Sequence, residues 1–224
     1  MQRILIKYKL EVTSMYSQSV QSYMPSVLRT FALSLAISVL GMAIGTQVPA
    51  ALFLPLAILE IAMLIGAFFL RKKKAIGYTF LYVFTFISGI TTFPIIAHYT
   101  AVAGSNVVLM AGVTTTVVFS GLALYATTTK RDLSFLGGML MAALLALIAI
   151  SIFNLFSPLS STAMLVFSFI GILVFSGYIL YDFNRMKQYG VTAEEVPLMA
   201  LNLYLDFINL FINILRFFGI LSKD

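Results

Sequence analysis

Seven apolar stretches of about 20 residues each constrain the fold of this 224-residue chain more than any other feature. A stretch of that length crosses the hydrocarbon core of a bilayer as a helix, which satisfies its own backbone hydrogen bonds in lipid. The predicted spans are 27–47, 50–70, 75–97, 105–127, 133–154, 161–183 and 197–220. The connections between them are short. The sequence therefore predicts an all-α integral membrane protein with seven transmembrane helices.

Composition supports this class and excludes others. Apolar residues make up 61% of the chain and charged residues 10%, against about 45–50% and about 25% in soluble domains. The absence of cysteine excludes disulfides, thiolate metal sites and cysteine nucleophiles. The net charge of +6 comes from basic residues dispersed between the spans, so we expect it to set topology and not to bind nucleic acid.

Basic residues alternate between the two sides of the predicted spans. They precede the first span and follow the second, fourth and sixth, whereas the other loops contain no Lys or Arg. Because basic loops stay in the cytoplasm, we expect a bacterial inner-membrane protein with a cytoplasmic N-terminus and an extracytoplasmic C-terminus. A re-entrant last helix would instead return the C-terminus to the cytoplasm.

We divide the chain into a cytoplasmic tail, residues 1–26, and one membrane domain, residues 27–221. The tail lacks the apolar core and cleavage site of a signal peptide, and we assign it no function. An added extension that ends before Met15 is an open alternative for part of it.

The last predicted span carries one continuous polar stripe. Its members are separated by four, three, four and three residues, which keeps them on one helix face; they are Asn202, Asp206, Asn209, Asn213 and Arg216. An otherwise hydrophobic helix must turn such a stripe toward protein or toward a water-filled path. The two interpretations are interhelical hydrogen bonds and a cavity or ion path.

Asp182 and Asp206 form a candidate pair. They lie on the last two spans, which we expect to pack antiparallel around a loop at 184–196, so the two carboxylates can lie at similar depth. Carboxylates in contact do not both ionise easily, and they titrate as a pair. Such a pair can sense pH, pass protons or bind a hard cation such as calcium. The alternative is that Asp182 pairs with a basic residue at the rim, Arg71 or Arg185.

Glu60 lies in the middle of the second span, where an ionisable group needs a partner or stays protonated. Arg71 follows eleven residues later, near the same helix face. The two residues could mark the middle and the inner mouth of one path. A protonated Glu60 with a structural role is the alternative.

The remaining polar residues suggest structural roles. His98 is the only histidine and is expected at the surface, while the threonines at 114–116 are expected to bond their own helix backbone. Thr192 and Glu195 have capping-box spacing and should start the last helix. The small-residue pattern at 41–45 indicates helix packing. No catalytic motif is present, so we expect neither an enzyme nor a tightly bound cofactor.

Two segments of the last spans resemble a family signature. The segment Gly177-Tyr-Ile-Leu-Tyr-Asp182, together with residues 203–216, is similar to the signature of the Bax inhibitor-1 family, and most like its bacterial members. Residues 54–60 and Arg71 also resemble the second helix of that family. The resemblance covers nearly all of 27–221.

The resemblance implies a fold and a function. The fold would have a central seventh helix flanked by two layers of three helices. The function would be a pH-sensitive calcium leak, with Asp182 and Asp206 as the pH sensor and candidate calcium ligands. Arg71 would latch to Asp182, and Glu60 would lie on the cation path.

We therefore expect a calcium-preferring leak channel gated by protonation of the aspartate pair. Its path would run along Glu60, Asp206, Asn209 and Asn213, with calcium as the permeant ion and the bilayer and protons as partners. No protein partner follows from the sequence. The alternatives are a proton-coupled transporter and a non-transporting membrane regulator of stress responses or protein quality control.

Overall fold

The computed structural model describes residues 23–70 and 76–222, and these residues contain seven long α-helices. Their bounds are α2 Met24–Gly45, α3 Ala50–Leu70, α4 Tyr78–Ala103, α5 Ser105–Thr128, α6 Leu136–Phe156, α7 Ser161–Tyr189 and α8 Val196–Leu221. All seven are long and apolar enough to cross a membrane. The predicted class, an all-α protein with seven spans, is confirmed.

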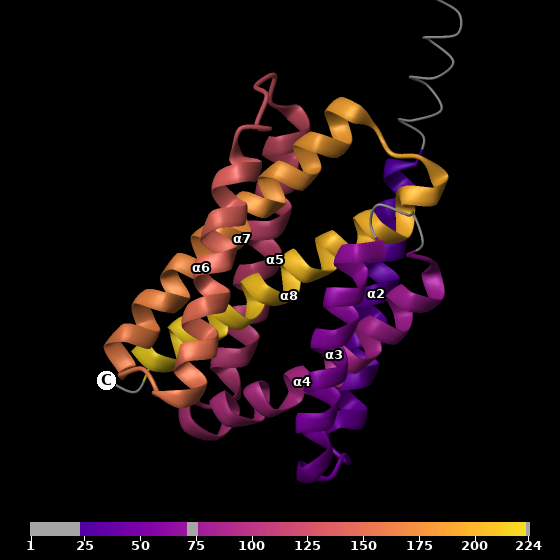
Figure 1. Ribbon diagram of the computed structural model, residues 1–224. Coiled ribbons are helices and arrows are strands. Elements are labelled where there is room, and N and C mark those ends of the chain that lie inside the picture. Colours follow the sequence, from indigo (N-terminus) through magenta and orange to yellow (C-terminus); the bar gives the residue numbers. More distant parts are fainter. Residues whose placement is uncertain (1–22, 71–75, 223–224) are drawn as a thin grey trace, which may run out of the picture.

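Helix α8 is the centre of the bundle. It contacts α2, α4, α5 and α7. In its membrane-spanning stretch 67% of the residues are buried, against 6% in that of α3 and 11% in that of α6. Figure 1 shows α8 running obliquely between the group α2–α4 and the group α5–α7. This is the expected arrangement of a central last helix between two layers of three helices.

Helix α7 extends six residues beyond the predicted end of its span, to Tyr189. Hydropathy marks only the apolar part of a helix, whereas the polar residues after Asp182 continue the same helix. The predicted loop at 184–196 is therefore too long. The chain turns at Gly190, whose φ of 69° favours glycine, and a 3-10 turn, η2 Ala193–Glu195, leads into α8.

Helices α2 and α4 pack through glycine at close range. A Cβ atom on Gly41 would overlap the carbonyl group of Phe86, and one on Gly89 would overlap the carbonyl group of Ser38. Small residues of this kind let two membrane helices approach closely and gain van der Waals contact. The packing role predicted for the small residues at 41–45 is confirmed.

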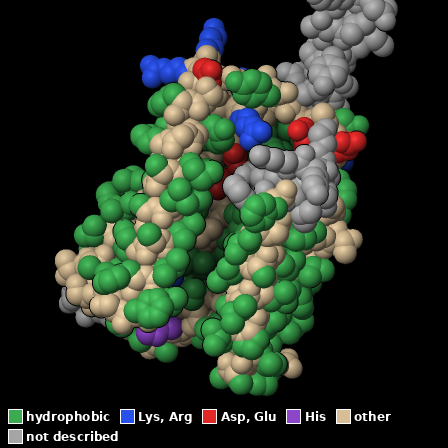
Figure 2. All heavy atoms as spheres, viewed as in Figure 1, with side chains coloured by type: hydrophobic (Ala, Val, Ile, Leu, Met, Phe, Trp, Pro, Cys, Tyr) green, Lys and Arg blue, Asp and Glu red, His purple; other side chains and the backbone are tan. Residues whose placement is uncertain are grey.

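The outer helices present apolar side chains on their exposed faces. Leu54 in α3 is 70% exposed and Leu155 in α6 is 78% exposed, and Figure 2 shows hydrophobic side chains along the flanks of the bundle. In a bilayer these faces contact lipid tails, which are as apolar as leucine. The buried polar side chains Asp182, Asp206 and Asn213 lie instead in the interior of the bundle, on α7 and α8.

Candidate functional site: the polar face of α8

The polar stripe of α8 faces the interior of the bundle. Asp206 and Asn213 are each only 5% exposed, and Asn202, Asn209 and Arg216 are half-buried. The surrounding helices thus cover the stripe. The stripe is therefore turned away from lipid, as both interpretations of its spacing require.

Two asparagines of the stripe use their amide nitrogens within their own helix. Asn209 Nδ2 donates to the carbonyl oxygen of Leu205, and Asn213 Nδ2 donates to that of Asn209, each at 2.8 Å. The buried Asn213 Oδ1 has no hydrogen-bond partner among residues 23–70 and 76–222. Asn213 lies against Gly171 of α7, where a Cβ atom would overlap the amide group. The stripe therefore holds a buried oxygen acceptor at the α7–α8 contact.

Asp182 and Asp206 are both buried, at 7% and 5% exposure. They lie on α7 and α8, which pack against each other, and both side chains interact with other groups of the protein. Asp182 is seven residues before the end of α7, and Asp206 is ten residues after the first residue of α8. Figure 2 shows acidic side chains set back in a hollow near the end of the bundle that carries Lys and Arg.

Of the two basic residues proposed as partners of Asp182, the structure describes only Arg185. Arg71 lies outside the described residues. Arg185 is exposed and lines a surface pocket together with Asp132.

Four phenylalanine rings from four helices form a cluster, and two of these phenylalanines directly follow the aspartates in the sequence. Phe183 follows Asp182 and Phe207 follows Asp206. Their rings lie 5.7 Å and 5.4 Å, centroid to centroid, from the ring of Phe119 in α5, which stacks at 5.1 Å on Phe31 of α2. Any movement of α7 against α8 at the aspartates must therefore disturb this aromatic cluster.

Glu60 is half-buried in α3 and faces α4. Its Oε2 accepts a hydrogen bond from the hydroxyl group of Thr91 at 2.5 Å. The partner that an intramembrane carboxyl group requires is thus a hydroxyl group on the neighbouring helix. The sequence alone does not identify this partner.

Tyr204 of α8 makes a second buried polar contact, which the sequence does not predict. Its hydroxyl group lies 2.8 Å from that of Ser38 in α2 and also interacts with Ser88 in α4. The spacing of Ser34, Ser38 and Gly41 along one face of α2 was the available signal. It marks a small-residue face without indicating its partner.

Asn184, which the sequence does not mark as a contact residue either, joins the end of α7 by hydrogen bonds to the end of α5 and to the loop between α5 and α6. Its Oδ1 accepts from the backbone N–H of Leu133 at 3.0 Å, and its Nδ2 donates to the carbonyl oxygens of Ala126 and Arg131. Close by, Lys187 Nζ donates to the carbonyl oxygen of Thr129. The turn of α7 that follows Asp182 is therefore held to its neighbours.

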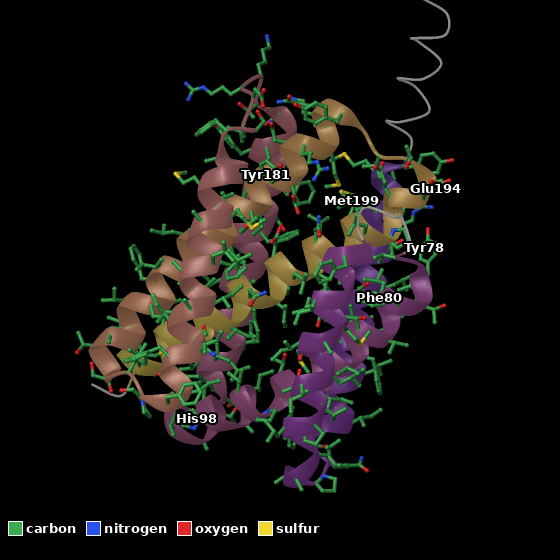
Figure 3. All side chains as sticks on the ribbon, in the orientation of Figure 1. Tyr78, Phe80, His98, Tyr181, Glu194 and Met199 are labelled. Carbon is green, nitrogen blue, oxygen red and sulfur yellow. The ribbon has the colours of Figure 1, made fainter. Side chains whose placement is uncertain are left out.

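Most of the residues predicted to be structural behave as expected. His98 is exposed at the end of the bundle opposite Glu194 (Figure 3). Thr115 and Thr116 donate to the carbonyl oxygens four residues earlier in α5. Thr192 and Glu195 form the predicted capping box.

Clusters that could bind a metal are absent from the part of the chain that the structure describes: no three His, Cys, Asp or Glu side chains come together there. Two aspartates alone fall short of the six to eight oxygen ligands that calcium takes.

Comparison with known proteins identifies the family. The family model described as "Inhibitor of apoptosis-promoting Bax1" matches residues 20–223, which covers all seven helices. The chain belongs to the Bax inhibitor-1 family. The resemblance noted in the signature of α7 and α8 is thereby confirmed.

Relatives within this family come from bacteria and from a eukaryote. The chain is 35% identical to the inner membrane protein YbhL of Escherichia coli K12 over 176 residues, 73% of each chain. It is 32% identical to an uncharacterized protein of Helicobacter pylori J99, over 95% of this chain and 92% of that protein. It is 38% identical to Bax inhibitor 1 of Schizosaccharomyces pombe, over 66% of this chain and 54% of that protein. This Bax inhibitor-1 family member is a multi-pass membrane protein.

Proposed function

We propose that this protein is a passive cation leak channel that prefers calcium and is gated by protonation of Asp182 and Asp206. The observation that carries the proposal is the burial of both carboxyl groups on two packed helices of a membrane bundle. Ionisable groups are costly at such positions and mark ion or proton pathways.

The path would run past Glu60 and then along α8, past Asp206, Asn209 and Asn213. These side chains supply oxygen atoms, the ligands that calcium prefers. A site with two carboxylates leaves most of the ion's coordination to water and amide oxygens, so binding is weak enough for release. Conduction requires such weak binding. The buried Asn213 Oδ1 is an acceptor of this kind.

Protonation of the aspartates would change the contact between α7 and α8. With one shared proton the pair carries a single negative charge, and with none the two charges repel each other and bind calcium more strongly. This change in repulsion would shift α8 against α7 and disturb the packing of Phe183 and Phe207. Arg71 would act as an alternative partner for Asp182. Calcium occupancy and channel opening need not change in the same direction with pH.

For the orientation, we propose an inner-membrane location with the N-terminus in the cytoplasm and the C-terminus outside. Most of the Lys and Arg side chains that Figure 2 shows gather at one end of the bundle. Lys130 and Arg131 lie in the loop between α5 and α6, and Arg185 and Lys187 lie in the last turns of α7. Basic loops are retained in the cytoplasm. Reporter fusions at both termini would test the orientation, and the same compartment for both would overturn it.

A non-transporting membrane regulator is the second candidate. It is favoured by the bonds that Asn209 and Asn213 make to their own helix backbone, since these give part of the stripe a structural role. A proton-coupled transporter that uses the same carboxylates is the third.

Calcium flux into proteoliposomes of the purified protein separates the three candidates. A leak predicts calcium entry down its gradient, without saturation and without proton counterflow, and a changed flux in folded Asp206→Asn protein. Thr116→Val is a matched control, because Thr116 is exposed and bonds only its own helix; its flux should equal that of the parent. Saturable uptake with proton counterflow would indicate the transporter. Background flux in folded parent protein would indicate the regulator.

A further inference from the structure

A polar pocket of about 110 Å³ lies between the end of α7 and the loop that joins α5 to α6. Its lining residues are Asp132, Ser134, Tyr181, Asn184, Arg185 and Tyr189. Since one water molecule takes about 30 Å³ in the liquid, the pocket has room for a small polar group. None of the polar residues assigned to the cation path lines it.

The walls of the pocket are held in place from three sides. Asn184 bonds the backbone of Arg131 and Leu133, the residues on either side of Asp132. Asp132 Oδ1 accepts from the backbone N–H of Ser134 at 2.8 Å and from the side chain of Gln188 at 3.3 Å. The ring of Tyr181 lies against Gly137 of α6. The pocket is therefore formed before any ligand binds.

The pocket lies at the depth of lipid headgroups. Helix α7 has 29 residues, which at 1.5 Å per residue is about 44 Å, longer than the ~30 Å hydrocarbon core. Its last turns therefore extend beyond the hydrocarbon. Figure 3 places Tyr181 near that end of the bundle, and tyrosine is a residue typical of the membrane interface.

The lining combines groups for both signs of charge. The guanidinium group of Arg185 can bind a phosphate with two parallel hydrogen bonds. The carboxylate of Asp132 can pair with an ammonium group, and the ring of Tyr189 can bind the same cation through its face. A purely anionic ligand would be repelled by Asp132, so a ligand that carries both charges fits best.

We propose that this pocket binds the phosphoethanolamine headgroup of a membrane phospholipid, with the phosphate on Arg185 and the ammonium group on Asp132 and Tyr189. The inference is independent of the calcium leak. The lipid would contact the α5–α6 loop and the end of α7, which Asn184 holds together.

Native mass spectrometry of the purified full chain tests the proposal with lipids of identical acyl chains. We expect phosphatidylethanolamine to bind more tightly than phosphatidylglycerol or phosphatidylcholine. Arg185→Gln and Asp132→Asn should each weaken it about tenfold, the loss expected for one hydrogen bond to a charged group. Arg29→Gln is the matched control, since Arg29 is an exposed arginine at the start of α2 that does not line the pocket, and its binding should stay unchanged.

Three results would overturn the proposal. The first is tighter binding of phosphatidylglycerol, above all if Asp132→Asn strengthens it further, because the pocket would then select anionic lipids through Arg185 alone. The second is free phosphoethanolamine that binds as tightly as phosphatidylethanolamine, because the ligand would then be a soluble molecule and not a membrane lipid. The third is unchanged lipid binding in Tyr189→Ala protein. Because the Tyr189 side chain is exposed, we expect this variant to fold even if the other two do not.

Discussion

The hydroxyl oxygens of Ser38 and Tyr204 lie 2.8 Å apart in the middle of the bundle. Ser38 is 1% exposed and Tyr204 is fully buried, so their hydrogen bond is shielded from water and lipid. It joins the central helix to α2, which is itself packed closely on α4. Tyr204 lies two residues before Asp206 in the sequence. The bond therefore holds α8 to the group α2–α4 close to one of the proposed sensor residues.

Replacement of Tyr204 by Phe should lower stability by a modest amount. Hydrogen bonds between membrane helices contribute about 0.6 kcal/mol on average and up to about 1.7 kcal/mol. We expect the Tm of Tyr204→Phe protein to fall by a few degrees in a thermal unfolding assay in detergent. Tyr125→Phe, at an exposed position of α5, is the control and should leave Tm unchanged. Equal Tm values for parent and Tyr204→Phe would show that the bond is not stabilising.

Replacement of Gly89 by Ala should force α2 and α4 apart. The added methyl group would overlap the backbone of Ser38, which cannot move as a flexible side chain does. Overpacking of this kind costs about 1–3 kcal/mol, so Tm should fall by several degrees. Gly112→Ala in α5 adds the same group where nothing lies within 4 Å, and it should be neutral or slightly stabilising. Equal effects at the two positions would contradict close glycine packing.

Replacement of Glu60 should lower calcium flux, and replacement of its hydrogen-bond donor Thr91 should lower it less. Glu60→Gln removes the charge from the proposed path, and we expect calcium flux into proteoliposomes to fall by about tenfold or more. Thr91→Val removes only the hydrogen-bond donor and should cause a smaller fall. If both variants conduct as the parent does, Glu60 is structural and lies off the path.

Asp132 should make a small contribution to stability that depends on pH. The backbone N–H of Ser134, the Ser134 side chain and the Gln188 side chain hold the pKa of this exposed carboxyl group below its usual value. A depressed folded-state pKa gives stability that is present above the unfolded pKa of about 3.9 and is lost as pH falls through the folded pKa. The Tm difference between parent and Asp132→Asn protein should thus shrink from pH 6 to pH 3. A difference that stays constant with pH would refute this assignment.

Local sequence patterns predicted much of this molecule. Hydropathy located the seven spans, and the spacing of Thr192 and Glu195 predicted the capping box, because both depend on residues close together in the chain. The three- and four-residue spacing around Asp206 likewise predicted a buried face of α8.

Long-range contacts could not be predicted in the same way. Ser38 and Tyr204 are 166 positions apart, and Asn184 is 51 positions from Leu133, so no periodicity pairs them. Hydropathy predicts the end of α7 too early, because the polar helical turns after Asp182 carry no hydropathy signal. The roles of Asp182 and Asp206 remain predictions, since burial shows where a carboxyl group lies and not what it conducts.

The most direct test of the account is the pH dependence of calcium flux through parent, Asp182→Asn and Asp206→Asn proteins in proteoliposomes between pH 6 and 8. Each variant must first show a folded monodisperse profile and a Tm near that of the parent. The account predicts a flux that changes with pH in the parent and loses that dependence in both variants, because one carboxyl group alone cannot share a proton. A parent flux that is independent of pH, or variants that keep the parent's pH profile, would contradict gating by the aspartate pair.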